Sequence, residues 1–389
     1  MFEIAMKEKY RAVVFSTPND VLKALAVLVS PIASQHVRRL GLSPHVLSQT
    51  ICRFQSQKVP GRHSRLLKVF RNRKREFQEV ITQDQILRVF NGLSRLDSLE
   101  LHSRGNSDCR ELRISMPFIA PTFASFKELR NLILDIMLEG YQSLSPTIVF
   151  PMLERLDIVL SHAYCSTDHK SILDNVLAPF VNNHHATLRI LHLSTLRSLY
   201  IFDIPSFLSN LRHYPQLETF GLWHPFVSIR QSDSAGVTHI LRLHSEHLLE
   251  LSLHAKGPIQ YSMYPTADQW YAQEFLQVKL PKLQVLDLDI ELYPDIVQTT
   301  SYLGQFRHSL LSLKLSVNML SYEDVKEIAQ TFSEQDGLLE LQMSIDVLSP
   351  HLLSLLASEL PSLEILVLEF DKLSSSTSDG GVWSDLLVS

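Results

Sequence analysis

The chain has 389 residues, of which 45% are hydrophobic and 20% are charged, and its formal net charge at pH 7 is −5. This composition predicts a globular protein with a large apolar core. The negative charge argues against a general nucleic-acid or membrane-surface binder, because both functions need a broad positive field.

Cysteine usage and the first residues indicate the compartment. Cys52, Cys109 and Cys165 lie far apart, which fits neither a disulfide framework nor zinc-ligand spacing, so we expect reduced thiols. No apolar h-region of a secretory signal follows Met1, and no N-x-[ST] glycosylation acceptor occurs in the chain. These features predict an intracellular protein, in the cytoplasm or the nucleus.

Residues 1–44 are predicted to form an N-terminal cap and a first degenerate repeat. The fragment "HVRRLGLSP" places Val37, Leu40 and Leu42 in the pattern L-x-x-L-x-L. The apolar stretch "ALAVLVSPIA" within the same segment is too short to cross a bilayer and is interrupted by Pro31. No membrane association is therefore expected.

Residues 45–91 are predicted to form an extended or irregular repeat that contains a basic helix. The stretch "RHSRLLKVFRNRKREF" at 62–77 is rich in arginine and lysine. A solvated amphipathic helix explains it most simply. Two further interpretations remain open, namely a nuclear-localisation patch and a contact with RNA or an acidic partner. The basic patch for either of them consists of Arg71, Arg73, Lys74 and Arg75.

Residues 92–371 contain ten copies of the phrase L-x-x-L-x-L. The eleven-residue segments "LPKLQVLDLDI" and "LPSLEILVLEF" show how closely two copies can agree. The middle apolar positions are 99, 132, 156, 191, 220, 251, 286, 313, 341 and 366, so the steps range from 24 to 35 residues. Internal repetition at this spacing is typical of solenoid proteins.

Each repeat is predicted to contain one strand and one helix. Alternating apolar residues in L-x-L point to one side of a short strand, whereas apolar residues three and four apart in 294–310, 321–338 and 349–363 indicate helices. Stacked repeats bury both apolar faces. Because strands lie about 4.8 Å apart while helices are about 10 Å wide, the stack must curve with its strands inside.

The phrases "LPKLQVLDLDI", "YPQLETFGLWH" and "FPMLERLDIVL" resemble leucine-rich repeats of the helix-bearing subtypes. This resemblance implies an α/β fold, a leucine-rich-repeat-like solenoid that is curved, with parallel strands on the concave face and helices on the convex face. The family usually places Asn or Cys three residues after the last leucine of the phrase. Only Asn318 matches that position here, so we expect an irregular curve.

Together with the preceding segment "YRAVVFS", these repeats are similar to the part of fungal F-box/leucine-rich-repeat proteins that follows the F-box. In that family the F-box docks onto the Skp1 subunit of a ubiquitin ligase, and the solenoid recruits the substrate. An F-box opens a small helical bundle with a Leu-Pro phrase, and no such bundle is evident here. Skp1 binding is therefore expected only if the full-length protein carries an F-box.

Strand residues between the leucines are expected to face the concave side and to contact a partner. The predicted contact residues are Glu100, His102, Arg155, Asp157, His192, Trp223, Glu250, His254, Asp287, Asp289 and Lys314. With Asp135, Glu340 and Glu369, which share this face, acids outnumber Lys and Arg by eight to two. A merely solvated face is the plain alternative. The bias predicts a partner with a basic surface, and Trp223 is the best anchor because binding hot spots favour tryptophan.

No catalytic motif or set of four zinc ligands was found in the sequence. His162, Cys165 and His169 form one loose group and His244, His247 and His254 another, and we expect both to be ordinary surface side chains. No enzyme activity, cofactor or metal is predicted. Residues 372–389 are predicted to be a flexible tail or a cap.

These expectations favour a monomeric, non-enzymatic protein-binding scaffold that serves as the substrate-recruiting region of an F-box-type ubiquitin ligase adaptor. Two alternatives stay open. One is a ligase-independent protein-binding adaptor or inhibitor. The other is an RNA-associated protein that uses the basic segment 62–77.

Overall fold

The computed structural model describes residues 8–57, 83–102, 119–161, 168–195, 202–225, 231–255, 270–289, 295–333 and 337–374. The chain divides into two compact units, Met1–Leu188 and Arg189–Ser389, which we call unit 1 and unit 2. None of the described helices combines the length and the apolar composition needed to cross a membrane.

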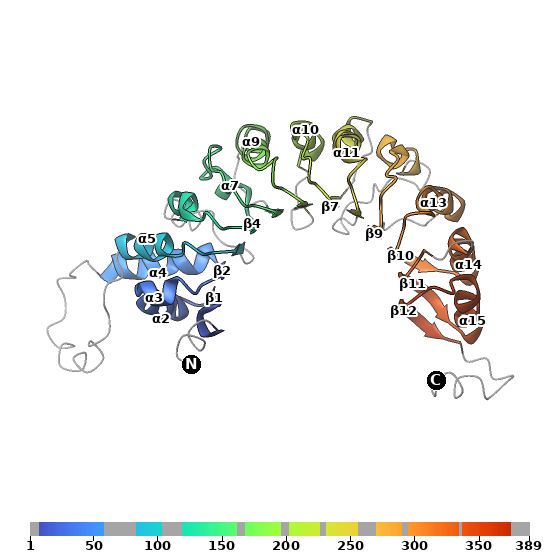
Figure 1. Cartoon of the computed structure of the whole chain (residues 1–389), viewed down its shortest axis with the longest axis horizontal. Coiled ribbons are helices and arrows are strands. Elements are labelled where there is room, and N and C mark those ends of the chain that lie inside the picture. The colour runs from blue at the N-terminus through green and yellow to red at the C-terminus, as the bar shows by residue number, and fades with distance from the viewer. Residues whose placement is uncertain are drawn as a thin grey trace. The chain divides into compact units, whose positions relative to one another are not determined.

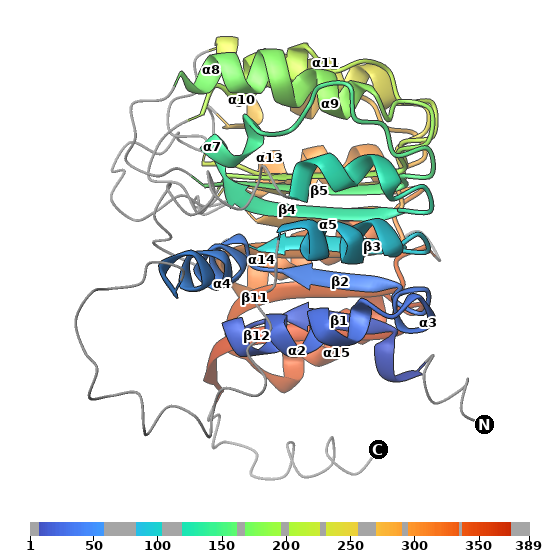
Figure 2. The same ribbon diagram turned by 90° about the vertical axis from the view of Figure 1, so that its left-hand side faces the viewer.

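Unit 1 alternates parallel strands with helices. Its strands, in chain order, are β1 (Ala12–Phe15), β2 (Arg39–Leu42), β3 (Ser98–His102), β4 (Asn131–Met137) and β5 (Arg155–Ser161). Its helices are α2 (Pro18–Leu28), α3 (Pro31–Ser34), α4 (Pro44–Gln57), α5 (Gln83–Gly92), η1 (Ala120–Ser125), α7 (Leu138–Tyr141), α8 (His169–Ile172), η2 (Leu173–Leu177) and α9 (Ala178–Asn182). Each strand pairs with the next one in parallel (Figure 2).

Unit 2 continues the same alternation. Its strands are β6 (Ile190–Ser194), β7 (Thr219–Trp223), β8 (Glu250–His254), β9 (Val285–Asp289), β10 (Ser312–Leu320), β11 (Glu340–Leu348) and β12 (Ile365–Leu373). Its helices are α10 (Ile204–Ser209), α11 (Gln231–His244), η3 (Glu274–Gln277), α13 (Ile296–Leu303), η4 (Gly304–Phe306), α14 (Tyr322–Phe332) and α15 (Pro350–Glu359). Neighbouring strands again pair in parallel and in chain order.

The strand register confirms the repeat predicted from the sequence. Within each unit, the middle apolar position of each phrase stands opposite the same position of the next phrase. The aligned residues are Leu40, Leu99, Leu132 and Leu156 in unit 1 and Leu191, Phe220, Leu251, Leu286, Leu313, Leu341 and Leu366 in unit 2. All but Leu366 are buried. Within each unit the strands line the inner side of the bend and the helices cover the outer side (Figure 1), as in a leucine-rich-repeat-like α/β solenoid.

A recurring backbone contact joins successive repeats. The N–H groups of Asp97 and Ser98, just before β3, both donate to the carbonyl of Arg38 at 2.8 and 2.9 Å. The N–H groups of Leu249 and Glu250, just before β8, donate in the same way to the carbonyl of Glu218 at 2.8 and 3.0 Å. The repeats therefore enter their strands with one common geometry.

The helices predicted in 294–310, 321–338 and 349–363 are present as α13, α14 and α15, and each is shorter than predicted. Polar side chains fix their first turns. Ser321 and Asp324 form a reciprocal capping box at the start of α14, and Ser349 accepts from the N–H of Leu352 at the start of α15. Such caps satisfy N–H groups that have no partner within the helix.

The structure adds a strand that the sequence did not predict. β1 pairs with β2, with Val13 opposite Leu40 and Phe15 opposite Leu42, so it begins the first repeat inside the segment 1–44. At the other end β12 continues to Leu373, two residues into the predicted tail, because Lys372 and Leu373 pair with β11. The basic segment 62–77 and the remainder of the tail lie outside the described residues.

Candidate protein-binding face

The eleven predicted contact residues lie on strand positions that alternate with the buried leucines. Glu100, His102, Arg155 and Asp157 belong to β3 and β5 of unit 1, and the other seven belong to β6–β10 of unit 2. Ten of them are half-buried, whereas Asp289 is buried. The predicted set thus falls into two groups, one in each unit.

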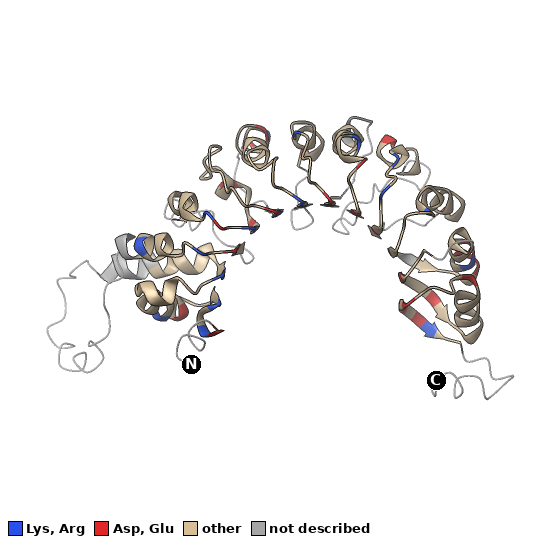
Figure 3. Cartoon of the chain, in the orientation of Figure 1, with Lys and Arg blue, Asp and Glu red and all other residues tan. Residues whose placement is uncertain are grey.

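The acidic bias predicted for the whole chain is concentrated in unit 2. Among the described strand positions on the concave face of that unit, the acids are Glu250, Asp287, Asp289, Glu340, Asp346, Glu369 and Asp371. Lys314 is the one lysine at those positions, and the ammonium of Lys372 near the end of β12 lies 3.2 Å from Asp346 and 3.7 Å from Asp371. The corresponding positions of unit 1 carry the acids Glu100, Asp135 and Asp157 beside Arg39 and Arg155. Figure 3 shows where these charges lie on the strands.

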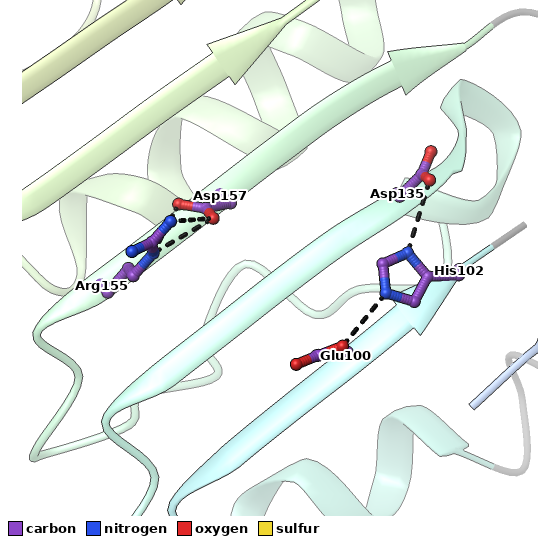
Figure 4. Close-up of polar contacts among 5 residues, drawn as sticks. All are labelled: Glu100, His102, Asp135, Arg155 and Asp157. Carbon is purple, nitrogen blue, oxygen red and sulfur yellow. Dashed lines mark hydrogen bonds and ion pairs between the residues drawn. The ribbon is translucent and has the colours of Figure 1, made fainter. Parts of the chain in front are cut away.

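The charged residues of the unit 1 face bind one another (Figure 4). The Nε2 atom of His102 lies 3.2 Å from Glu100, and its Nδ1 atom lies 3.4 Å from Asp135 on the next strand. The hydrogen bond to Asp135 raises the pKa of His102 and, with that to Glu100, outweighs the lowering by burial. Arg155 donates to both carboxylate oxygens of Asp157 at 2.9–3.1 Å. This face therefore presents little net charge.

His254 is held between two carboxylates in unit 2. Its Nε2 atom lies 3.2 Å from Asp287 and its Nδ1 atom lies 3.5 Å from Asp289, which stands opposite it on β9. Burial lowers the pKa of His254, but the hydrogen bonds to Asp287 and Asp289 outweigh burial and raise the pKa to about 9. The imidazole is consequently cationic at neutral pH.

Asp287 and Asp289, both predicted to contact a partner, differ in exposure. The Asp289 side chain is 12% exposed, whereas the Asp287 side chain is 24% exposed. Asp287 is therefore the more accessible carboxylate of the two that contact His254.

Trp223 lies in a row of aromatic rings that crosses three strands. Its ring centroid is 5.1 Å from that of His192 on β6, at an interplanar angle of 80°, and 5.0 Å from that of His254 on β8, at 39°. Gly221 lies under this row. A Cβ atom there would stand 2.4 Å from Cζ3 of Trp223 and 2.8 Å from Cδ2 of His192.

Gly221 was not among the predicted contact residues, although the sequence carries a signal for it. A glycine inside a strand often marks a close approach of another group to the backbone. In "TFGLW" the glycine occupies the outward position two residues before Trp223, where it leaves room for the indole to fold back over the strand. Gly221 therefore sets the position of Trp223.

The last two contact residues make weaker polar interactions. Glu250 accepts a hydrogen bond from the Thr219 hydroxyl at 3.3 Å, and the Lys314 ammonium lies 3.8 Å from Glu340. Both interactions join neighbouring strands and leave the side chains half-exposed.

The prediction that the grouped histidines are ordinary surface side chains is wrong for His244. This ring is buried at the end of α11, where Nε2 accepts from the N–H of Tyr214 and Nδ1 donates to the carbonyl of Ile240. His184 is buried in the same way in unit 1. Among the residues that the structure describes, no group of three His, Cys, Asp or Glu side chains could hold a metal ion.

Two sets of predicted residues fall outside the described part of the chain. They are the basic patch Arg71, Arg73, Lys74 and Arg75, and the pair His162 and Cys165. Their predicted roles stay predictions.

Comparisons with known proteins add little to this geometry. No model of a protein family matches the chain, and no curated protein matches it. A solved structure described as the crystal structure of the Rad7 and Elc1 complex in yeast is similar over 79% of this chain and 79% of that chain, with a TM-score of 0.42 and 18% sequence identity. A likeness this distant says nothing about function, so the site has to be interpreted from its own residues.

Proposed function

We propose that this protein is a non-enzymatic protein-binding scaffold and that the concave face of unit 2 recruits a partner with a basic surface. The observation that carries the proposal is the charge of that face, where seven acids outnumber Lys314 and the neighbouring Lys372, and where Trp223 lies on β7. We call the outward strand positions of β6–β12 the unit 2 face.

Two physical arguments support a basic partner. A surface with one dominant sign of charge accelerates the approach of an oppositely charged protein and disfavours partners of like charge. A half-exposed tryptophan within such a surface supplies the large, rigid contact area typical of binding hot spots. Trp223 contacts His192 and His254, and His254 in turn contacts Asp287, so the anchor and an acid share one histidine neighbour.

The finer proposal is that the scaffold recruits substrates for an F-box-type ubiquitin ligase. Its support is the resemblance of the repeats to fungal F-box/leucine-rich-repeat proteins. Coexpression of the full-length protein with Skp1 tests it: the two proteins should co-purify if the full-length protein carries an F-box. If that protein has an F-box and fails to retain Skp1, the ligase-independent adaptor or inhibitor is the function that remains.

Neutralising the unit 2 face tests the broader proposal. One variant carries Glu250→Gln, Glu340→Gln and Glu369→Gln on strands. The matched control carries Glu274→Gln, Glu323→Gln and Glu327→Gln on the helix side, where these glutamates are exposed. Both variants lose three negative charges, so they differ in the face that is altered.

Proteins retained by the wild-type chain from a cell extract should be identified, purified and titrated against all three forms. We expect the strand-side variant to bind about tenfold more weakly, since three charge contacts of about 0.5 kcal/mol each sum to roughly that factor. The control should bind as the wild type does. If every purified partner bound the strand-side variant with wild-type affinity, the proposal would be wrong.

A further inference from the structure

The indole of Trp223 occupies an unusual position on its strand. Because the ring atoms Cζ3 and Cη2 lie where a side chain of residue 221 would begin, the six-membered ring rests on the outer surface of β7. His192 meets the ring edge-on from one side, and His254 leans toward it from the other. We call Trp223 with these two histidines and Gly221 the Trp223 platform.

We propose that the Trp223 platform and Asp287 together bind an arginine side chain of the partner. This inference rests on the proposed function and names the side chain that the unit 2 face selects. The guanidinium group would lie over the indole and donate hydrogen bonds to the Asp287 carboxylate.

The chemistry of the platform favours arginine over lysine. A guanidinium is planar and weakly hydrated, so it stacks on an indole face and can donate two parallel hydrogen bonds to one carboxylate. A lysine ammonium is more strongly hydrated and has no flat surface to stack. The platform offers the indole of Trp223. His254, which lies beside that indole, also contacts the Asp287 carboxylate, whose side chain is 24% exposed.

The net charge beside the platform favours the binding of an added cation. His254 carries one positive charge and lies between Asp287 and Asp289, so the three groups retain one net negative charge when both carboxylates are ionised. His254 also holds Asp287 by a 3.2 Å contact, which keeps the carboxylate beside the ring. An incoming guanidinium would neutralise the remaining charge.

Unit 1 provides an internal comparison. Its cluster of Glu100, His102 and Asp135 repeats the arrangement of a histidine between two carboxylates. The chain has three tryptophans, at 223, 270 and 383, so unit 1 contains none. An arginine preference that arises from stacking should therefore depend on the platform and not on the unit 1 cluster.

The full chain should be titrated with two amidated peptides in 50 mM salt, one with four arginines and one with four lysines, each separated by Gly-Ser. Isothermal calorimetry would measure affinity. We expect the arginine peptide to bind about three- to tenfold more tightly than the lysine peptide, as expected for a guanidinium stacked on an indole.

Four variants locate the preference. Trp223→Leu and Asp287→Asn should each remove it, and Gly221→Ala should also do so, because the added methyl group displaces the indole without deleting it. Glu100→Gln in the unit 1 cluster should leave it intact. Circular dichroism should confirm that Gly221→Ala and Trp223→Leu remain folded. Asp287→Asn tests the arginine site even if either of those two variants fails to fold.

Failure of the inference differs from failure of the proposed function. Equal binding of both peptides, unchanged by Trp223→Leu and Asp287→Asn, would overturn the arginine site while leaving an acidic binding face. If neither peptide bound, both the arginine site and the recruitment of basic partners would be wrong. If Trp223→Leu, Gly221→Ala and Asp287→Asn all retained the arginine preference, the assignment of the site would likewise be overturned.

Discussion

The Nε2 atom of His244 accepts a hydrogen bond from the backbone N–H of Tyr214 at 2.9 Å, across 30 residues of sequence. His184 makes the equivalent contact with the N–H of Phe150 at 3.0 Å in unit 1. Each imidazole also stacks on the aromatic ring of the residue whose N–H it accepts. These histidines therefore join successive repeats, and they can do so only in the neutral form because Nε2 must accept.

The stability of the protein should consequently fall as the pH is lowered. Burial lowers the pKa of both His184 and His244 to about 4, whereas an unfolded histidine titrates near 6.5. Between these values the unfolded chain binds more protons, so the stabilisation is complete above about pH 6.5 and is lost as the pH falls through 4. Each histidine can contribute up to about 3 kcal/mol to this change.

Urea denaturation of the wild type and of a His184→Gln, His244→Gln variant at pH 7.5 and pH 5 would measure this effect. The variant should be less stable at pH 7.5 and should lose less stability between the two values. An equally large loss in both proteins would show that other groups cause the acid sensitivity.

His254 should produce the opposite dependence at alkaline pH. Hydrogen bonds to Asp287 and Asp289 raise its pKa to about 9 despite burial, so the folded state binds its proton more tightly than the unfolded state. The resulting stabilisation is complete below about pH 6.5 and disappears as the pH rises through 9.

An NMR titration of the imidazole signals between pH 6 and pH 10.5 would measure the pKa of His254 directly. Asp287→Asn should bring that pKa down toward the ordinary value of histidine. A His254 signal that titrates near pH 6.5 in the wild type would contradict the contacts of His254 with Asp287 and Asp289.

Substitutions of the two aspartates that contact His254 should differ in their effects on stability and on partner binding. Asp289→Asn replaces a buried carboxylate and should lower the free energy of unfolding by about 1–3 kcal/mol, the usual range for a lost charged hydrogen bond. Asp287→Asn should cost less stability and should reduce partner binding more, because Asp287 is the more exposed. Denaturation midpoints and the peptide titration together check this division, and equal effects of the two substitutions on both measurements would refute it.

Leucines at the same register position should differ in their contribution to stability. Leu341 is 0% exposed and Leu366, its partner on β12, is 37% exposed, because no described element packs beyond β12. Leu341→Ala should cost about 3 kcal/mol, as a substitution in a packed core does, and Leu366→Ala about 1 kcal/mol. Urea denaturation of the two variants measures the difference. Equal costs would mean that Leu366 is covered in solution.

Much of the fold could be predicted because one pattern determines it locally. In L-x-L the leucines face one side of a strand wherever the phrase occurs, so the strand positions and core leucines follow from the sequence. β1 was missed because Val13 and Phe15, rather than leucines, occupy its core positions in "AVVF". The pattern was present in β1, but its residue types differed from the repeated phrase.

Tertiary structure alone decided how the outward side chains pair and which of them are exposed. The contact of His254 with Asp289 depends on the pairing of β8 with β9, whose paired residues lie 35 positions apart in sequence. The burial of His184 and His244 depends on an N–H group in the preceding repeat that needs an acceptor. The sequence by itself determined which side of each strand a residue occupies, because strand alternation is a local property. Only the stacking of successive repeats could set the contact of His254 with Asp289, the burial of His184 and His244, and the row formed by Trp223 with His192 and His254, because each arises from groups on different repeats brought together by folding.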